Sequence, residues 1–532
     1  MSLLLACLLA TTAGCEPPPR TPPLAPGILF IAVDDLNDWI GPLGGHPDAR
    51  TPNFDRLAAR GITFTRAYTA SPACNPSRSA VMTGLLPTST GVYLNNQPLR
   101  SAVPEVVTLA QRLRQEGFVT AEAGKVLHEP DPLSWMERQP PSRDPEPPGR
   151  PINGLDTDRF FDWGPLDQPA SALSDYKVTE WAAQWLAKRG DEPFFLAVGL
   201  GKPHLPWFVP QEYFEALPDA GVRLPEVLEG DLDDVPRGRA MNIADPQGDH
   251  RQVLENGLWP QAVASYLASV HFADAMVGRL LDALEASPAA ERTIVILWSD
   301  HGFHLGEKEH WRKSTLWEEG TRVPLFISAP GVTTPGSVCH RPASLLDLYP
   351  TVLDLVGLPL QAVLPQIPGG SSPQDQSPED SSPSITTGLL PEGKSLVPWL
   401  RDPERQGAGP VLTMLRRDFS VRSERWRYTD YVGQGEELYD HAKDPNEWTN
   451  LLHNPGGSVD PAVQKIRQEL SRFIPTDFAP DGPKARRPPE DGPIPPKPKN
   501  PKNPENPKNP ENSKNPESSD DPENPEPPHP KR

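Results

Sequence analysis

The run Gly27-Ile28-Leu29-Phe30-Ile31-Ala32-Val33, followed directly by Asp34-Asp35, is the most informative segment for the fold. Every residue of the run is apolar or glycine; a proline stands before it, and two carboxylates follow it. A strand with one face in water alternates polar and apolar residues, whereas a strand covered on both faces is apolar throughout. The segment therefore predicts a buried parallel strand whose carboxyl end carries two acidic side chains.

Two further segments repeat this pattern. Residues 293–298 (TIVILW) lead into Ser299-Asp300-His301-Gly302, and residues 193–200 (PFFLAVGL) lead into Gly201-Lys202-Pro203-His204. Open α/β sheets bind their ligands beyond the carboxyl ends of parallel strands. These polar residues are therefore candidates for one shared site.

Helical patterns lie between the strands. Residues 51–58 begin with a capping threonine and a first-turn proline, and residues 266–284 form a longer amphipathic segment. Strands that alternate with helices predict an α/β fold with a doubly wound, mostly parallel central sheet. Residues 411–452 alternate aromatic and charged side chains, which predicts a small antiparallel sheet as a C-terminal lobe.

The composition of the 532-residue chain predicts unfolded segments, because its 71 prolines exceed ordinary usage. We expect a disordered insertion at 361–392 within a main domain over 27–405, and a disordered proline-rich tail at 479–532 after a sub-domain over 406–475. The formal net charge of -20 argues against a nucleic-acid partner, which requires a basic face. It does not argue against small anionic ligands, which a few converging cations can bind.

Residues 1–15 are typical of an export segment. The apolar run from Leu3 to Ala13 is too short to span a bilayer and is shaped like a secretory signal. Small residues before Cys15 resemble a bacterial lipoprotein cleavage site, so a lipid anchor on Cys15 and simple secretion both remain open, with a periplasmic or cell-surface location in either case. Cys7 lies in the signal, Cys15 would carry the lipid, and Cys74 belongs to the motif described next, so Cys339 is left without a partner and we expect no disulfide framework.

Residues 74–78, Cys-Asn-Pro-Ser-Arg, are the most specific motif in the chain. A lone buried cysteine beside a turn proline is the usual alternative, but it accounts neither for the Pro-Ser-Arg nor for the continuation at 79–84 (SAVMTG). The motif resembles the Cys-x-Pro-Ser-Arg signature of the sulfatase family, in the alkaline phosphatase superfamily. The resemblance implies that a formylglycine-generating enzyme oxidises Cys74 to formylglycine, whose hydrated form is the nucleophile.

The acidic residues at the strand ends are candidate metal ligands. Adjacent carboxylates repel one another unless a cation lies between them, and oxygen ligands suit calcium or magnesium, with calcium favoured by irregular geometry. Each pair alone is also compatible with solvated residues at a strand end. Taken with the cysteine motif, they resemble the sulfatase metal set, which implies one calcium ion held by Asp34, Asp35, Asp300, His301 and the modified Cys74.

Five further roles are implied by the same resemblance. Lys125 would neutralise a sulfate oxygen, and His128, in the same Gly-Lys-x-x-His motif, would hydrogen-bond the formylglycine. His204 would contact the sulfate and protonate the leaving sugar oxygen. Lys313 would be the last cation of the set, and Arg78 would hold the formylglycine in place. Taken singly, such residues are more often surface or packing residues, but their order matches the family's.

The resemblance covers about residues 27–455. It is greatest to the iduronate-2-sulfatase branch, whose motifs are similar to His301, to residues 35–39 (DLNDW) and to residues 437–440 (ELYD). It implies a sulfated carbohydrate as the substrate, with a uronic acid 2-sulfate as the candidate. Two rivals remain open. One is a phosphomonoester or phosphodiester hydrolase of the same superfamily, and the other is a noncatalytic carbohydrate-binding surface lipoprotein that has kept the fold.

Overall fold

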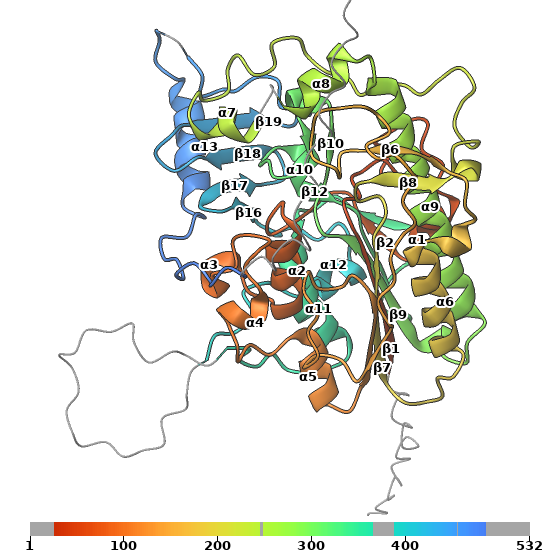
Figure 1. Cartoon of the computed structure of the whole chain (residues 1–532). Coiled ribbons are helices and arrows are strands. Elements are labelled where there is room, and N and C mark those ends of the chain that lie inside the picture. Colours follow the sequence, from red (N-terminus) through yellow and green to blue (C-terminus); the bar gives the residue numbers. More distant parts are fainter. Residues whose placement is uncertain (1–25, 245–247, 365–387, 455, 486–532) are drawn as a thin grey trace, which may run out of the picture. The chain divides into compact units, whose positions relative to one another are not determined.

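An eight-stranded sheet forms the centre of the fold, and the strand predicted at 27–33 lies in its interior (Figure 1). The structure is a computed structural model that describes residues 26–244, 248–364, 388–454 and 456–485. In spatial order the strands are β14 (Ser337–Cys339), β2 (Ile62–Phe64), β13 (Leu325–Ser328), β9 (Thr293–Ser299), β1 (Gly27–Val33), β7 (Phe194–Leu200), β4 (Val119–Gly124) and β5 (Glu137–Arg138). The expected export segment with Cys15 lies outside the described residues.

Alternate residues of β1 are buried on opposite faces of the sheet. Leu29, Ile31 and Val33 pack into one core, whereas Ile28 and its even-numbered neighbours pack into the other. The first core is covered by α1 (Pro52–Arg60), α6 (Ser174–Leu186) and α9 (Trp259–Glu285), and the second by α2 (Cys74–Thr83), α5 (Leu109–Gln115), α11 (Leu348–Leu355) and α12 (Val397–Arg401). The predicted doubly wound α/β fold is confirmed. The sheet is parallel from β9 to β5, and β13 runs antiparallel to β9 and β2.

Parallel register aligns the carboxyl ends of the central strands. Val33 pairs with Leu200 and with Ser299, and Gly124 at the end of β4 pairs with Gly199. Gly124 has a φ of 73°, and a Cβ there would lie 2.0 Å from the carbonyl oxygen of Gly199, so only glycine fits this close approach. The segments that follow β1, β4, β7 and β9 therefore leave the sheet at one common edge.

Shorter elements connect the strands and helices of the main domain. Small sheets are formed by β3 (Ala67–Tyr68), β12 (Arg322–Val323) and β15 (Ala343–Ser344), by β6 (Trp163–Leu166) and β8 (Trp207–Pro210), and by β10 (His304–Leu305) and β11 (Trp311–Arg312). Short helices are α3 (Pro87–Thr90), α4 (Leu99–Ala102), α7 (Arg239–Ala244), α8 (Asp249–Glu255) and α10 (Glu318–Thr321). Most of these elements lie in the connections that follow the strands of the central sheet.

A four-stranded antiparallel sheet forms the predicted C-terminal lobe, with strands β16 (Val411–Leu415), β17 (Asp418–Arg422), β18 (Trp426–Asp430) and β19 (Glu436–Asp440) and the helix α13 (Pro461–Ser471) packed against it. The fully buried Arg427 bonds to the carboxylates of Glu318 and Glu447, and the Met414 N–H donates to the Ala70 carbonyl over 2.9 Å. Removing one partner of a buried ion pair lowers the stability of the fold by about 3–5 kcal/mol. Arg427 therefore fastens the lobe to α10.

The ends of the expected insertion are packed, contrary to the prediction for 361–392. Val363 is buried in the second core, and Leu364 forms a β-bridge with Leu389. The Glu392 carboxylate accepts the Leu86 N–H over 2.6 Å. Three apolar residues in a polar segment carry this packing, and residues 365–387 lie outside the described part of the chain.

The tail also begins later than predicted, because residues 479–485, here called the C-terminal strap, are bonded to the main domain. The N–H groups of Ala479, Gly482 and Ala485 donate to the carbonyls of Thr88, Gly91 and Asn96 over 2.6, 2.8 and 2.7 Å. The three donors are spaced by three residues, the repeat of an extended polyproline helix, so they lie along one side of the strap. Residues from 486 onward lie outside the described residues.

The described residues contain no disulfide and no helix that could span a bilayer. Cys74 and Cys339, the cysteines within the described ranges, are buried and free. Among the helices of this part of the chain, none has the length and hydrophobicity needed to cross a bilayer. The fold therefore rests on packing and polar contacts, with no disulfide among the described residues.

A chain that ends after Phe478 should be less stable than a chain that ends after Ala485. We expect a loss of about 2–4 kcal/mol, because each lost backbone hydrogen bond contributes about 1 kcal/mol and the buried Gln97 amide would lose the Gly482 carbonyl. Equilibrium urea unfolding of the two chains measures the difference. The longer chain is the matched control because it keeps the strap, and equal stabilities would contradict the packing described above.

Candidate active site

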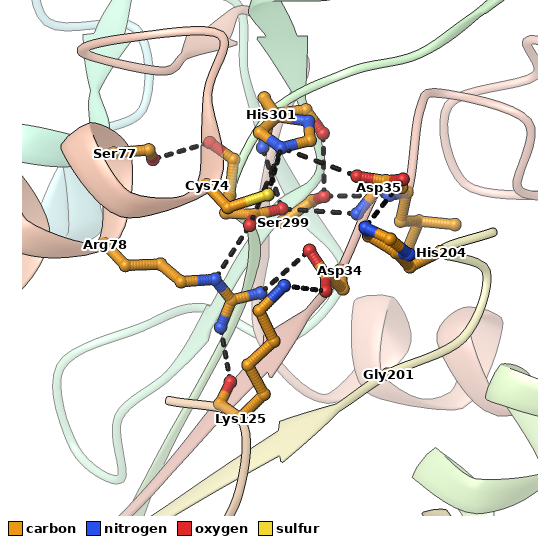
Figure 2. Close-up of polar contacts among 12 residues, drawn as sticks. Asp34, Asp35, Cys74, Ser77, Arg78, Lys125, Gly201, His204, Ser299 and His301 are labelled. Atoms are coloured by element: carbon orange, nitrogen blue, oxygen red, sulfur yellow. Dashed lines mark hydrogen bonds and ion pairs between the residues drawn. The ribbon is translucent and has the colours of Figure 1, made fainter. Parts of the chain in front are cut away.

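Two adjacent carboxylates follow β1 at the common edge of the sheet (Figure 2). Asp34 and Asp35 are each 1% exposed. Asp35 has a φ of 61°, a left-handed conformation that aspartate tolerates better than most residues, and the chain turns there as it leaves the strand. The Asp35 N–H donates to the carboxylate of Asp300, which follows β9, over 3.2 Å. The two acidic segments predicted from the sequence therefore lie in contact.

Cys74 is the first residue of α2 and is 2% exposed. The positive end of the helix dipole favours negative charge at that position. Arg78 follows one turn later on the same helix face and is fully buried. Four residues of spacing thus place a nucleophilic side chain and a cation side by side.

The guanidinium of Arg78 joins three strand ends, as Figure 2 shows. Its Nε lies 2.7 Å from Asp300, and its Nη2 lies 3.2 Å from Asp34. Its Nη1 donates to the carbonyls of Lys125 and Val126, which follow β4. Arg78 therefore contacts carboxylates and carbonyls that support the site, and its position behind them suits a structural cation.

Two lysines supply the other fixed charges. Lys125 Nζ contacts the carboxylate of Asp34, and Lys313 Nζ lies 2.6 Å from Asp35 and 3.3 Å from the sulfur of Cys74. Burial would raise the pKa of the Cys74 thiol, but Lys313 and Lys125 outweigh it and hold that pKa well below its usual range. Negative charge on residue 74 is therefore stabilised at neutral pH.

Two of the predicted histidines face Asp35. His301 Nε2 lies 3.4 Å from the sulfur of Cys74 and 3.4 Å from the nearer Asp35 oxygen. His204 Nε2 lies 3.9 Å from the other Asp35 oxygen, and His204 Nδ1 contacts the Leu205 carbonyl. An Nδ1–H donated to that carbonyl leaves Nε2 as the nitrogen that faces the site.

His128 lies farther from the carboxylates than the other predicted residues. Its Nδ1 is 3.6 Å from the Glu129 carboxylate, and its side chain lines a cavity of about 320 Å³ together with Lys125. Burial and then the charge of Lys125 lower the pKa of His128. A neutral ring therefore stands beside the cations.

The buried acids and the histidine form a group with the spacing of metal ligands. Ligand atoms of Asp34, Cys74, Asp300 and His301 all lie within 4.8 Å of one another, and Asp35 belongs to an overlapping group. One buried oxygen of Asp35 accepts no hydrogen bond, and one of Asp34 has only the ion pair with Arg78 at 3.2 Å. Burial and the charge of Asp34 together raise the pKa of Asp300 to about 6, although Arg78 lowers it. These residues fit a hard divalent cation, which would relieve both features.

Sequence reasoning missed two serines that fix the strand ends. Ser77 Oγ donates to the Asp300 carbonyl over 2.6 Å. Ser299 Oγ accepts the Leu36 N–H over 3.0 Å and donates to the His301 carbonyl over 2.9 Å (Figure 2). Both serines stand inside the segments that were singled out, so their position in the motifs was a usable signal.

A second layer of polar residues holds the α2 motif from outside. Asn75 Nδ2 donates to the carbonyls of Leu94 and Gln97 over 3.1 and 2.7 Å, and its N–H donates to Asn95. Gln97 in turn donates to Gly482 of the C-terminal strap over 2.9 Å. The strap is therefore two contacts away from the residue that follows Cys74.

The arrangement is suited to the hydrolysis of a negatively charged ester. Fixed cations around a buried nucleophile stabilise charge that develops in the transition state, and they need no rearrangement to do so. A helix N-terminus and a group of metal-binding side chains add to this stabilisation.

Comparison with known proteins agrees with this chemistry. A family model for sulfatases matches residues 26–358. A sulfatase from Formosa agariphila is 34% identical over 81% of this chain and 83% of its own, and a choline-sulfatase from Rhizobium meliloti is 31% identical over 82% and 84%. Iduronate 2-sulfatase from Homo sapiens is 30% identical over 67% of this chain and 73% of its own. The chain therefore belongs to the sulfatase family.

Solved structures agree with the fold. A phosphonate monoester hydrolase from Agrobacterium radiobacter has a TM-score of 0.68 at 21% identity and covers 84% of this chain and 94% of that chain. Likeness at this identity concerns the fold alone. It matches the predicted alkaline phosphatase-like architecture of a large sheet with a small lobe.

Replacing Asp300 with asparagine should remove a bound divalent cation and lower turnover at least about 100-fold, because one anionic ligand is lost. Atomic emission of the purified protein measures the metal content, and sulfate release measures turnover. Asp274→Asn is the matched control, since Asp274 is a buried carboxylate that accepts backbone N–H groups of α1 away from the site and has a pKa raised to about 6 by burial. Full metal occupancy in Asp300→Asn would contradict the ligand assignment.

Proposed function

We propose that this chain is an exported sulfatase that releases sulfate from a sulfated sugar, with a formylglycine made from Cys74 and one calcium ion. One observation supports the proposal above all others. Cys74 stands at the N-terminus of α2, with Lys313 Nζ 3.3 Å from its sulfur and ligand atoms of Asp34 and Asp300 within 4.8 Å. A structural cysteine would gain nothing from such a set of charges.

Asp34, Asp35, Asp300 and His301 would hold the calcium ion together with the oxidised side chain of residue 74. When bound, the ion supplies positive charge next to the sulfate oxygens. Calcium is favoured over transition metals because the donors are mostly carboxylate oxygens, and over magnesium because their arrangement is irregular. The Asp35 oxygen that accepts no hydrogen bond supports this choice of ligands.

Residue 74 would provide the nucleophile. In its oxidised form the hydrated aldehyde supplies a hydroxyl that attacks sulfur and a second hydroxyl that allows sulfate to leave without attack by water. The N-terminus of α2 stabilises negative charge on this side chain, and Arg78 keeps α2 aligned with the strand ends.

The two lysines would bind the sulfate oxygens. Burial lowers the pKa of a lysine, but Asp34 raises that of Lys125 and Asp35 raises that of Lys313, with a net upward shift in each case. Both side chains are therefore cationic at neutral pH. They are anchored to the carboxylates before the substrate arrives, so charge stabilisation costs little reorganisation.

The histidines would handle the protons. His128 has a lowered pKa, so its ring is neutral near pH 7 and can accept a hydrogen bond from a hydroxyl on residue 74. His204 presents Nε2 toward Asp35 at 3.9 Å, and a proton on that nitrogen would be given to the leaving sugar oxygen. An alkoxide is a poor leaving group, so this proton transfer matters more for a sugar than for a phenol.

A uronic acid 2-sulfate within an oligosaccharide or polysaccharide is the proposed substrate. Similarity to iduronate 2-sulfatase from Homo sapiens supports it, together with His301 at the last ligand position. The choline-sulfatase of Rhizobium meliloti is 31% identical, against 30% for the iduronate 2-sulfatase. A small sulfate ester is therefore the alternative substrate to be tested. A phosphomonoester or phosphodiester and a noncatalytic carbohydrate-binding role are the remaining rivals. We place the enzyme in the periplasm or at the cell surface, with Cys15 as the residue that would carry a lipid.

The peptide that contains residue 74 should lose roughly 18 Da relative to its thiol form when the chain is coexpressed with a formylglycine-generating enzyme, because the thiol becomes an aldehyde. Mass spectrometry of the tryptic digest measures the change. Cys339, which is buried and free, lies outside the motif and is the internal control, since its peptide should keep the thiol mass. An unmodified Cys74 under these conditions would contradict the proposed nucleophile.

A substrate panel tests the specificity. We expect sulfate release from an oligosaccharide that ends in a uronic acid 2-sulfate to exceed release from choline sulfate or from a glucosamine 6-sulfate by at least about 100-fold in kcat/KM. Aryl phosphate should be a poorer substrate than aryl sulfate. The Cys74→Ala variant, expected to fold and to be inactive, is the background control. Phosphate release that exceeds sulfate release, or glycan binding without any turnover, would favour one of the rivals.

A further inference from the structure

Asp175 is a buried carboxylate close to the site that the proposed mechanism does not use. It lies in the first turn of α6, and its two oxygens accept the N–H groups of Gly201 and Lys202 over 2.7 and 2.8 Å. These two residues follow β7 and precede His204 by only a few positions. Asp175 therefore connects α6 to the segment that carries the proposed proton donor.

The segment that carries His204 is fixed at several points. The His204 N–H donates to the Gly201 carbonyl over 2.9 Å. Lys202 Nζ donates to the Pro206 carbonyl over 2.6 Å, and the indole of Trp207 donates to the Pro203 carbonyl over 2.7 Å. These bonds make residues 201–207 a small rigid unit, and the bonds from Asp175 set the position of its first residues.

The position of this unit determines where the His204 ring lies. The ring contacts the backbone of its own segment through Leu205 and reaches Asp35 at 3.9 Å. A displacement of about 1 Å can lower the rate of a step about 100-fold when a reacting group must be aligned. The ring therefore depends on the anchoring of residues 201 and 202.

Asp144 and Lys202 are charged residues close to the contact between Asp175 and residues 201–202. Lys202 Nζ lies 3.7 Å from Asp144, whose carboxylate also accepts the Ser174 N–H over 2.6 Å. Burial and the charge of Asp144 raise the pKa of Asp175 to about 6, while the two N–H groups lower it. The side chain is thus mostly a carboxylate at neutral pH, the form that accepts both bonds.

We propose that Asp175 is a positioning residue that sets His204 for proton transfer to the leaving oxygen, through the backbone N–H groups of Gly201 and Lys202. The inference rests on the proposed function, in which His204 is the proton donor. It adds a specific dependence: loss of the Asp175 carboxylate should impair substrates whose leaving group must be protonated and should spare substrates whose leaving group need not be.

The test compares Asp175→Asn, His204→Ala and the double variant of the full, matured chain on two substrates. One is the sulfated sugar, with an alcohol leaving group, and the other is 4-nitrophenyl sulfate, with a stable phenolate leaving group. We expect His204→Ala to lower kcat on the sugar by about 100-fold to 10,000-fold and Asp175→Asn by about 10-fold to 100-fold. Both should change kcat on the aryl sulfate by less than about 5-fold, because a phenolate departs without a proton.

Asp347→Asn is the matched control for folding effects. Asp347 is also buried, also accepts two backbone N–H groups, from Ser344 over 3.0 Å and Lys394 over 2.9 Å, and also has a pKa raised to about 6 by burial. It lies just before α11, and both of its N–H donors are outside residues 201–207. Its replacement should lower thermal stability as much as Asp175→Asn does and leave the ratio of the two kcat values unchanged.

The outcomes separate the inference from the proposed function. A leaving-group-dependent loss in Asp175→Asn, with less than about 3-fold further loss when it is added to His204→Ala, supports the positioning role. Equal losses on both substrates in Asp175→Asn, with a leaving-group effect kept in His204→Ala, overturn the inference alone. Equal losses on both substrates in His204→Ala overturn the proton-donor role in the proposed function, and the inference with it.

Discussion

The guanidinium of Arg78 lies between the carboxylates that follow two separate strands of the sheet. It contacts Asp34 after β1 and Asp300 after β9, and it donates to the two carbonyls after β4. Its backbone belongs to α2, in another layer of the fold. A fully buried cation is tolerated only while its partners stay in place, and the carboxylates avoid mutual repulsion only while the cation stays between them. Three features therefore depend on one another: the register of the strands, the alignment of α2 with them, and the convergence of the acidic groups.

The central fold could be predicted because its strands are buried on both faces. Such burial leaves continuous apolar runs at 27–33 and 293–298, and the parallel register of β1 with β9 then brings Asp34 and Asp300 to one edge. The candidate site followed from order and motif, since Cys74 and Arg78 are only four residues apart on a helix. The strands and this motif could be predicted because the interactions that determine them are local in sequence or repeat along a strand.

The supporting contacts could not be predicted in the same way. Asp175 accepts a hydrogen bond from the segment after β7, and Ser77 donates to the carbonyl of Asp300 across more than 200 residues of sequence. Neither residue belongs to a periodic pattern from which its partner could be predicted. The strap at 479–485 was assigned to the tail because proline and charged residues dominate it, although its three donors share one side. The composition of a segment does not show which of its backbone groups find a hydrogen-bond partner, and that decides whether the segment packs.

The strap is synthesised long after Cys74, and this order bears on when Cys74 is accessible. Cys74 is 2% exposed in the folded chain, so the formylglycine-generating enzyme of the proposed function would have to act before the loops around Cys74 close. The strap contacts those loops through Gln97, yet Ala479 is added 405 positions after Cys74, the difference between 479 and 74. At ordinary translation speeds of roughly 5–20 residues per second, that interval lasts about 20 to 80 s. Under the proposed function, oxidation of Cys74 would therefore fall within the interval before the strap is made and bonds to Gln97.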